Sequence, residues 1–167
     1  FHGNVGVMIK AASYILSLGP ELKKVSQLAV LNANYIKEQL KDVFLLPYDR
    51  PCMHECVFSD AWQEKNKVST LDIAKRLIDC GFHPPTIYFP HFKPYAEETL
   101  MVEAPESEGK EVIDELIAAM IRIAGEAESE PELLLEAPHS TPIRRTDDVL
   151  AARRPVLNYD DELNLPQ

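Results

Sequence analysis

The sequence predicts an α/β fold in which helices cover a short β-sheet, followed by an extended C-terminal tail. Three observations lead to this prediction. Apolar residues recur every three or four positions after Ser107, which is the spacing of a helix buried on one side. Residues 86–89 and 99–103 are short β-branched and aromatic runs typical of strands. Residues 129–167 hold five of the thirteen prolines and show no sustained periodicity.

The first 42 residues are predicted to be helices that connect into the sheet domain. One helix covers residues 8–18 and a second covers residues 20–41. Pro20 suits a first helical turn, where its missing N–H costs no hydrogen bond. Asn32 and Asn34 are interpreted as packing or capping groups rather than ligands. The second helix has one broad apolar face, formed by Leu22, Val25, Leu28, Ala29, Tyr35, Ile36 and Leu40.

Residues 43–128 are predicted to form the α/β domain itself. Strands are expected at 43–46, where Pro47 ends the run, and at 53–59, where side chains alternate. A helix should then begin at a capping box made by Ser69 and Asp72 and end at Gly81, which suits the C′ position. The pair Pro84-Pro85 prevents any return to helix before the next strand.

The remaining residues, 129–167, are predicted to be a proline-rich tail that lies over another surface. Short helices are possible at 131–135 and 147–153. Arg144 and Arg145 have two interpretations. They could dock on an acidic surface of a partner, or they could be solvated, in which case a surface ion pair would contribute only about 0–1 kcal/mol.

Length and charge limit the possible partners. The chain has 167 residues, enough for one domain with a real core. A net charge of −10 argues against nucleic acid and anionic membranes, because both would repel the chain. No apolar run approaches the roughly 20 residues of a membrane helix. The excess of acid is otherwise what solubility requires.

The three cysteines predict neither a disulfide framework nor a metal site. Cys52, Cys56 and Cys80 are an odd set without paired spacing. Cys52 and Cys56 flank Met53-His54-Glu55, but residues four apart on a strand are separated by roughly 13 Å. Zinc sites combine a tight cysteine pair with a second pair, which the sequence lacks. We therefore expect no metal, and reduced thiols.

The residues on their own indicate no complete active site. His54 and Glu55 are an acid–base pair by composition, but neighbours on a strand point to opposite faces. His83 stands at a rigid corner before Pro84, a placement that suits a ligand-facing residue or a structural histidine. The sequence contains neither a nucleophile elbow nor a glycine-rich phosphate loop.

Several sequence runs carry a family resemblance. They occur in the order FHGNVGV, AVLNANYIKEQL, MHECVF, GFHPPTIYFP with TLMVEAPESEGKEVIDELIAAM, and APHSTPIRR. Together they span nearly the whole chain. This set resembles the C-terminal part of the glycine-decarboxylating P-proteins of the glycine cleavage system, and more narrowly subunit 2 of the two-subunit form.

The resemblance implies the small C-terminal domain of a fold-type I pyridoxal-phosphate-dependent transferase, with a short, mostly antiparallel sheet. It implies a cytoplasmic enzyme that releases CO2 from glycine and passes the aminomethyl group to the lipoyl arm of H-protein. Pyridoxal phosphate would be held by a Schiff-base lysine upstream of Phe1, so this chain alone should bind no cofactor and be inactive. The implied partners are subunit 1, in an α2β2 assembly, and lipoylated H-protein.

The same resemblance suggests where the shared cleft lies. Many fold-type I relatives clamp the substrate carboxylate with an arginine at or near the position of Met101, which cannot form an ion pair. Candidate cleft-facing residues, chosen for family-like runs and loop or corner positions, are Asn4, His54, His83 and Thr86. A purely structural role for each is the alternative. The alternative function for the chain is a non-catalytic α/β module for subunit association.

Overall fold

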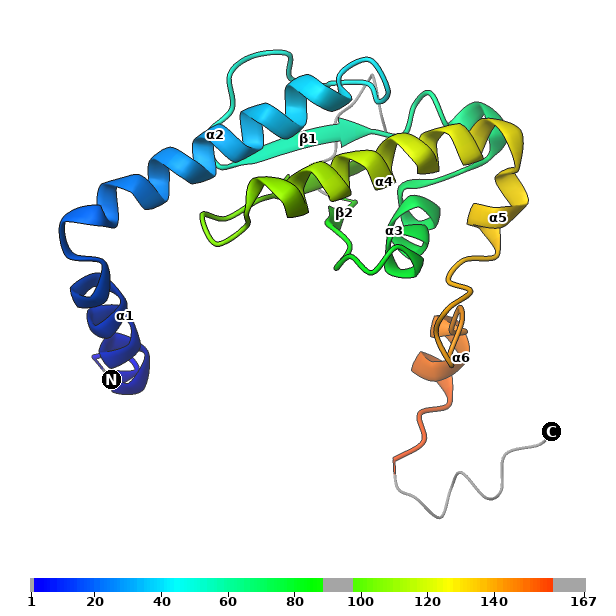
Figure 1. Ribbon diagram of the computed structural model, residues 1–167. Helices are drawn as coiled ribbons and strands as arrows, with labels where there is room; N and C mark the ends of the chain where they lie inside the picture. Colours follow the sequence, from blue (N-terminus) through cyan, green and yellow to red (C-terminus); the bar gives the residue numbers. More distant parts are fainter. Residues whose placement is uncertain (1, 89–97, 158–167) are drawn as a thin grey trace.

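The computed structural model describes residues 2–88 and 98–157. Its centre is a three-stranded antiparallel sheet built from β1 (Glu55–Ser59), β2 (Thr86–Ile87) and β3 (Thr99–Glu103), in the order β1-β3-β2 (Figure 1). The strand that comes last in sequence therefore lies in the middle of the sheet. This confirms the predicted fold class, a short antiparallel sheet covered by helices.

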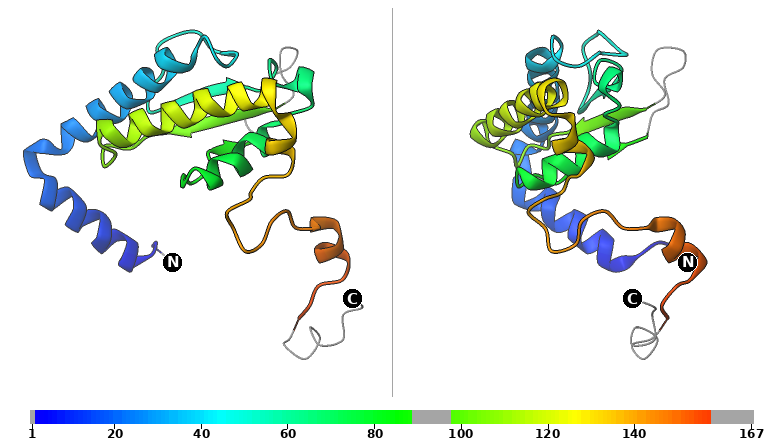
Figure 2. Two further views of the ribbon diagram at one scale, coloured as in Figure 1. Left: turned by 45° about the vertical axis from the view of Figure 1, so that its right-hand side comes forward. Right: turned by 90° about the vertical axis from the view of Figure 1, so that its right-hand side faces the viewer.

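Two long helices, α2 (Leu22–Leu40) and α4 (Lys110–Ser129), cover one face of the sheet (Figure 2). Their apolar stripes pack on the inward-facing side chains of β1 and β3, as the three-to-four-residue spacing predicts. The rings of Phe44 and Phe58 lie 6.0 Å apart within this core. The largest side chains that are fully buried here include Ile36, Leu40, Phe44, Phe58, Leu100, Met120 and Ile123.

The helix α3 (Thr70–Asp79) begins and ends as predicted. Ser69 and Asp72 form a capping box, in which each side chain accepts the backbone N–H of the other residue. Gly81, with φ of +85°, occupies the left-handed position after the helix. The chain then turns through the proline pair into β2, so α3 fixes where the short edge strand starts.

Three predicted elements differ from the structure. The strand predicted at 43–46 is wrong, because a turn after Leu40 sends Phe44 into the core and leaves only one bridge, between Leu45 and Ser59. The strand predicted at 53–59 begins two residues later. The strand predicted at 86–89 ends at Ile87, since Tyr88 has a left-handed φ of +67°; Phe89 is outside the described residues.

The first part of the predicted tail packs on this same chain. After α4 comes α5 (Pro131–Leu135), whose Leu134 is fully buried. Asp79, at the end of α3, accepts hydrogen bonds from the backbone N–H groups of His139 and Ser140, both at 2.7 Å. Arg145 donates to Asp72 at 2.6 Å and to the carbonyl of Leu134 at 2.9 Å, so this side chain forms contacts within the chain while it stays partly exposed. The end of the predicted tail, 158–167, is outside the described residues.

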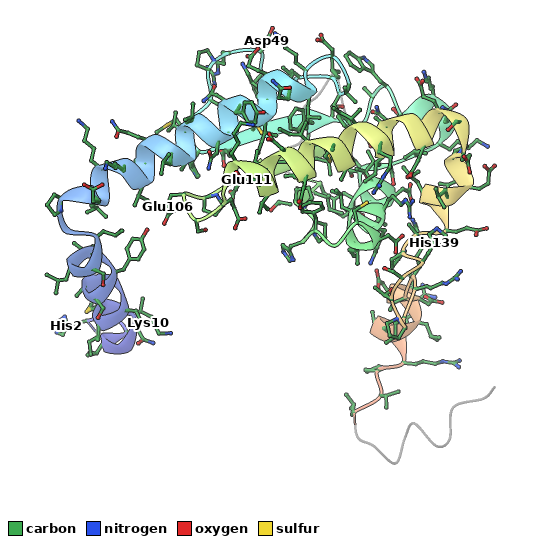
Figure 3. All side chains as sticks on the ribbon, viewed as in Figure 1. His2, Lys10, Asp49, Glu106, Glu111 and His139 are labelled. Atoms are coloured by element: carbon green, nitrogen blue, oxygen red, sulfur yellow. The ribbon has the colours of Figure 1, made fainter. Side chains whose placement is uncertain are left out.

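Two helices extend away from this body (Figures 1 and 3). The first, α1 (Val5–Leu18), joins α2 through the short 3-10 helix η1 (Gly19–Glu21), and none of its residues is buried. The second, α6 (Asp148–Arg153), follows the segment held by Asp72 and Asp79 and is also exposed. The helix predicted at 8–18 thus exists, and it starts three residues earlier than predicted because Asn4 caps it.

Candidate functional site

On the sheet face opposite α2 and α4, the part around Met101 stays at least partly exposed, whereas Ser59 and Thr99 at the other end of that face are buried. Side chains alternate along β1 and β3, so Cys56, Phe58, Leu100 and Val102 enter the core and their neighbours point the other way. In the register, Glu55 lies opposite Glu103, while Val57 and Thr86 flank Met101 on its two sides. We call this surface the open sheet face, defined by Glu55, Val57, Thr86, Met101 and Glu103.

Met101 occupies the centre of the open sheet face and lines both of the larger grooves beside it. One groove, the corner groove, has a volume of about 620 Å³ and runs between α4 and the turn that carries His83. The other, the His54 groove, has a volume of about 610 Å³ and lies next to the start of β1. A molecule on this face would therefore meet a thioether at its middle and a histidine on either side.

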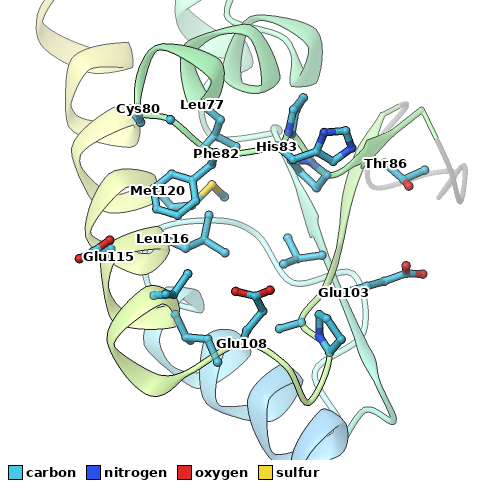
Figure 4. A pocket seen from close by; sticks show the side chains of 18 of the residues that line it. Leu77, Cys80, Phe82, His83, Thr86, Glu103, Glu108, Glu115, Leu116 and Met120 are labelled. Carbon is cyan, nitrogen blue, oxygen red and sulfur yellow. The ribbon is translucent and has the colours of Figure 1, made fainter. Parts of the chain in front are cut away.

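The corner groove is apolar within and acidic at its edges. Phe82, Leu116 and Met120 gather inside it, and the carboxylate of Glu108 projects into it (Figure 4). Thr86 and Glu103 point away from it, to the other side of the strands, as their place on the open sheet face requires (Figure 4). Its lining contains no lysine or arginine. This groove favours apolar groups and disfavours anions.

The His54 groove contains the only buried lysine among the residues described. Lys37 donates to Glu38 at 2.8 Å and to the carbonyl of Arg50 at 3.3 Å. The hydrogen bond that Lys37 donates to Glu38 raises the pKa of Lys37, in spite of its burial. The amine therefore stays protonated. A sequence signal for this burial existed, because Lys37 shares the helical face of Ala33 and Leu40.

The cysteines near this groove are chemically quiet. Asn34 holds Cys52 in place through two hydrogen bonds with its backbone, at 2.7 and 3.0 Å, which confirms the predicted packing role of Asn34. Burial raises the pKa of the Cys52 thiol and raises that of Cys56 much further. Both thiols stay protonated at neutral pH, and all three cysteines are free.

His54, Glu55 and Glu103 form a small cluster at the edge of the open sheet face. Their ligating atoms all lie within 4.8 Å of one another, and Nε2 of His54 is 3.9 Å from the Glu55 carboxylate. The prediction that His54 and Glu55 point to opposite faces is wrong. It assumed that both belong to the strand, but the strand begins at Glu55 and His54 lies in the bend before it.

The four predicted cleft-facing residues fall in two places. His54, His83 and Thr86 lie on or beside the open sheet face. Asn4 does not: its side chain accepts the N–H of Val7 at 3.2 Å and caps α1, far from the sheet (Figure 1). A role for any of the four residues in a cleft stays a prediction.

Sequence comparison identifies the class of protein to which this domain corresponds. Residues 25–139 match the family described as glycine dehydrogenase, C-terminal domain. This range covers the sheet, both grooves and all of the helices that pack on the sheet. The chain belongs to this family of glycine dehydrogenase C-terminal domains.

Individual relatives narrow the class further. The chain is 56% identical over 160 residues to a protein of Caldanaerobacter subterraneus subsp. tengcongensis, named probable glycine dehydrogenase (decarboxylating) subunit 2. Proteins of the same name from Halalkalibacterium halodurans and Bacillus velezensis are 54% and 52% identical. These matches cover 95–98% of the chain but only 32–33% of each relative. The chain thus spans about a third of the length of the curated relatives it matches.

Proposed function

We propose that this chain is the C-terminal domain of subunit 2 of a glycine-decarboxylating P-protein. The observation that carries the proposal is the 56% identity to a probable subunit 2, which covers 95% of the chain. In this proposal the whole protein binds glycine, releases its carboxylate as CO2 and passes the remaining aminomethyl group to the lipoyl arm of H-protein.

The open sheet face would form one wall of the glycine cleft. Its residues are at least partly exposed within the described chain, it has a groove on either side, and three of the four predicted cleft residues lie on or beside it. A wall of this kind shapes the pocket and keeps water from the reacting group. The rest of the cleft would come from the part of the protein outside this chain.

Met101 at the centre of that wall suits a decarboxylase. Its thioether cannot form an ion pair, and the charged groups of the open sheet face, Glu55 and Glu103, would repel a carboxylate. An ion pair at this point would stabilise the bound carboxylate more than the transition state, in which that charge is leaving. The five residues that define the open sheet face include no cation, and the nearest cations described, Lys37 and Arg50, line the His54 groove beside it. We propose that the carboxylate lies on the face itself and is therefore free to depart.

Pyridoxal phosphate, the cofactor implied by the family resemblance, does not fit Lys37, the one buried lysine among the residues described. A Schiff-base lysine needs a neutral amine, and the one buried lysine described, Lys37, is held protonated by Glu38. The acidic edges of the corner groove would also repel a phosphate. We propose that the cofactor and its lysine belong to the part of the protein outside residues 1–167, and we derive no chemical step through it here.

The proposed partners follow from the names of the relatives and from the charge. A subunit 2 implies a subunit 1, here in an α2β2 assembly, and the proposed reaction requires lipoylated H-protein. Nucleic acid and membrane are not among the proposed partners, because of the net charge of −10. We propose a cytoplasmic location.

The test is release of CO2 from glycine labelled at its carboxyl carbon. The complete protein, with subunit 1, pyridoxal phosphate and lipoylated H-protein, should release labelled CO2. The 167-residue chain in its place should release none. Failure of the complete, folded assembly to release CO2 would reject the proposal and favour the alternative, a non-catalytic module for subunit association.

Met101→Arg in the complete enzyme tests the role of the open sheet face. We expect the turnover number for decarboxylation to fall by a factor of roughly 10 or more, because one added ion pair to the carboxylate stabilises the bound substrate selectively. The KM for glycine should fall or stay unchanged. Met101→Leu is the matched control and should keep the rate. An unchanged rate in Met101→Arg would contradict the proposed position of the carboxylate.

A further inference from the structure

The feature that the proposed function leaves unexplained is the surface of α1. All of its large apolar side chains except the half-buried Leu18 are exposed, including Leu16 at 81%, Val5 at 66% and Ile9 at 61%. Its fourteen residues contain a single charged side chain, Lys10. A helix with this composition is normally buried. The described residues supply no partner that would bury α1.

The polar residues of α1 share one narrow stripe. Lys10, Ser13 and Ser17 follow one another at intervals of three and four, which places them on one side of the helix. The hydroxyl of Ser17 also donates to the Ser13 carbonyl at 2.7 Å. The rest of the circumference is apolar, so the missing partner must cover most of the helix. The apolar surface of α1 is formed by Val5, Val7, Met8, Ile9, Ala11, Ala12, Ile15, Leu16 and Leu18.

A side-chain hydrogen bond from the second half of α1 ties the helix to the body. Asn4 caps its first turn, and the hydroxyl of Tyr14 donates to the carboxylate of Glu106 in the loop before α4. Asn32 of α2 donates to the carbonyl of Pro105 at 3.1 Å, so the same loop contacts both helices. Tyr14 lies beside the polar stripe. Beyond this tie, α1 extends away from the body to which η1 joins it (Figure 3).

Two possible occupants fit this surface poorly. By length and composition, the run Val5–Leu40 would suffice to cross a membrane, so the expectation that no apolar run approaches that length is wrong. However, η1 interrupts it beside Glu21, Lys23 and Lys24, and α1 alone extends about 21 Å, short of the roughly 30 Å of a hydrocarbon core. A second copy of the chain would bring a further net charge of −10 against the first.

We propose that α1 is a core helix of the longer protein, buried against the part of the same polypeptide that precedes residue 1. This inference rests on the proposed function. Relatives align over 95–98% of the chain, α1 included, and are about three times as long. α1 lies next to the start of the chain, so a preceding segment is tethered within a few residues of it. Tethering gives such a segment a high effective concentration at this surface.

Hydrogen exchange followed by mass spectrometry tests the proposal directly. In the 167-residue chain, α1 amides should exchange quickly, because an unpacked helix of fourteen residues is marginal in water. In the longer protein they should exchange at least roughly 100-fold more slowly. Equal exchange rates in the two proteins would overturn the proposal.

Two variants on one helix provide the matched comparison. Leu16→Glu places a charge in the apolar surface and should restore fast exchange of α1 in the longer protein, with no change in the 167-residue chain. Ser13→Glu makes the same addition on the polar stripe and should leave protection intact. Equal effects of the two variants in the longer protein would also overturn the proposal.

Other occupants would be visible in the same experiment. Protection that appears only with vesicles of phosphatidylglycerol and phosphatidylethanolamine, only on addition of subunit 1, or only at high concentration of the 167-residue chain would each assign α1 to a different partner and overturn the proposal. CO2 release by the longer protein is measured in parallel. An active protein with unprotected α1 refutes this inference alone, whereas an inactive protein with protected α1 refutes the proposed function alone.

Discussion

The helices α1 and α4 differ in where their partners lie. α4 has one apolar stripe, and seven of its twenty residues are buried against the sheet and α2. α1 is apolar over most of its circumference, yet none of its fourteen residues is buried. A helix that buries one stripe has found its partner within the chain. A helix whose larger apolar surface stays exposed indicates a partner outside it.

The largest effect should come from truncating the same residue type on the two helices. Ile123→Ala in α4 creates a cavity in the core, because Ile123 is fully buried, and should lower the free energy of unfolding of the 167-residue chain by about 2–5 kcal/mol. Ile9→Ala in α1 should change it by less than about 0.5 kcal/mol, because Ile9 is 61% exposed. Urea unfolding measures both. Similar losses for the two variants would contradict the comparison.

A smaller effect tests whether the segment after α5 belongs to the same body as α4. Asp79→Ala removes the acceptor for His139 and Ser140 and one partner of Arg76, and should cost about 2–3 kcal/mol. Burial alone would raise the pKa of Asp79, but the hydrogen bonds from Ser140, His139 and Arg76 outweigh it and lower that pKa.

The Asp79 contribution should therefore be present above the usual carboxyl pKa, near 4, and disappear as the pH falls below it. Thermal unfolding of Asp79→Ala and of the unchanged chain between pH 7 and pH 3 measures this: the gap between them should narrow at low pH. Asp147→Ala, which removes an exposed cap of α6, is the control and should have little effect. A stability difference between Asp79→Ala and the unchanged chain that stays constant with pH would refute this role of the Asp79 carboxylate.

The third predicted effect is on the pH dependence of stability and runs in the opposite direction to that of Asp79. Burial raises the pKa of Asp60 to about 6, although the N–H of Thr70 donates to it at 2.9 Å. The folded state then binds a proton more tightly than the unfolded state, so stability should fall as the pH rises from about 4 to about 6. Asp60→Asn should remove this slope and stabilise the chain by about 1–2 kcal/mol at pH 7.5. Thermal unfolding measured across this pH range tests the prediction. A dependence of stability on pH that is unchanged in Asp60→Asn would refute it.

The smallest effect concerns the tie between α1 and the body. Tyr14→Phe removes the hydroxyl that donates to Glu106, both groups being exposed. We expect no measurable change in the unfolding of the 167-residue chain, but greater motion of α1 in backbone NMR relaxation. A clear loss of stability would mean that α1 already contributes to the core of this chain, against the comparison with α4.

Much of the fold followed from local patterns. The stripe of α4, the capping box at Ser69, the glycine after α3 and the position of β3 all depend on neighbouring residues, and the structure confirms them. The strand predicted at 43–46 failed, because its apolar residues are used for packing of Phe44 rather than for pairing. Side-chain alternation cannot distinguish these two uses of a short apolar run.

The candidate site was predictable only in part. The proline corner and the alternation of β1 and β3 place His83, Thr86 and Met101 near one another once the register is known. Register depends on contacts between distant segments, so the sequence did not reveal that Glu55 faces Glu103. Lys37 was overlooked because a lysine on an apolar face is usually exposed at its tip, whereas here Glu38 and the Arg50 carbonyl pair with it.

The central claim is that this chain is one domain of a longer decarboxylating subunit, and the intact mass of the gene product tests it most directly. The protein should be taken fresh from its native source under denaturing conditions and its mass measured by mass spectrometry. We predict a mass roughly three times 18.9 kDa, because the chain covers about a third of its relatives. A mass of 18.9 kDa would contradict the claim and leave the association module as the better account.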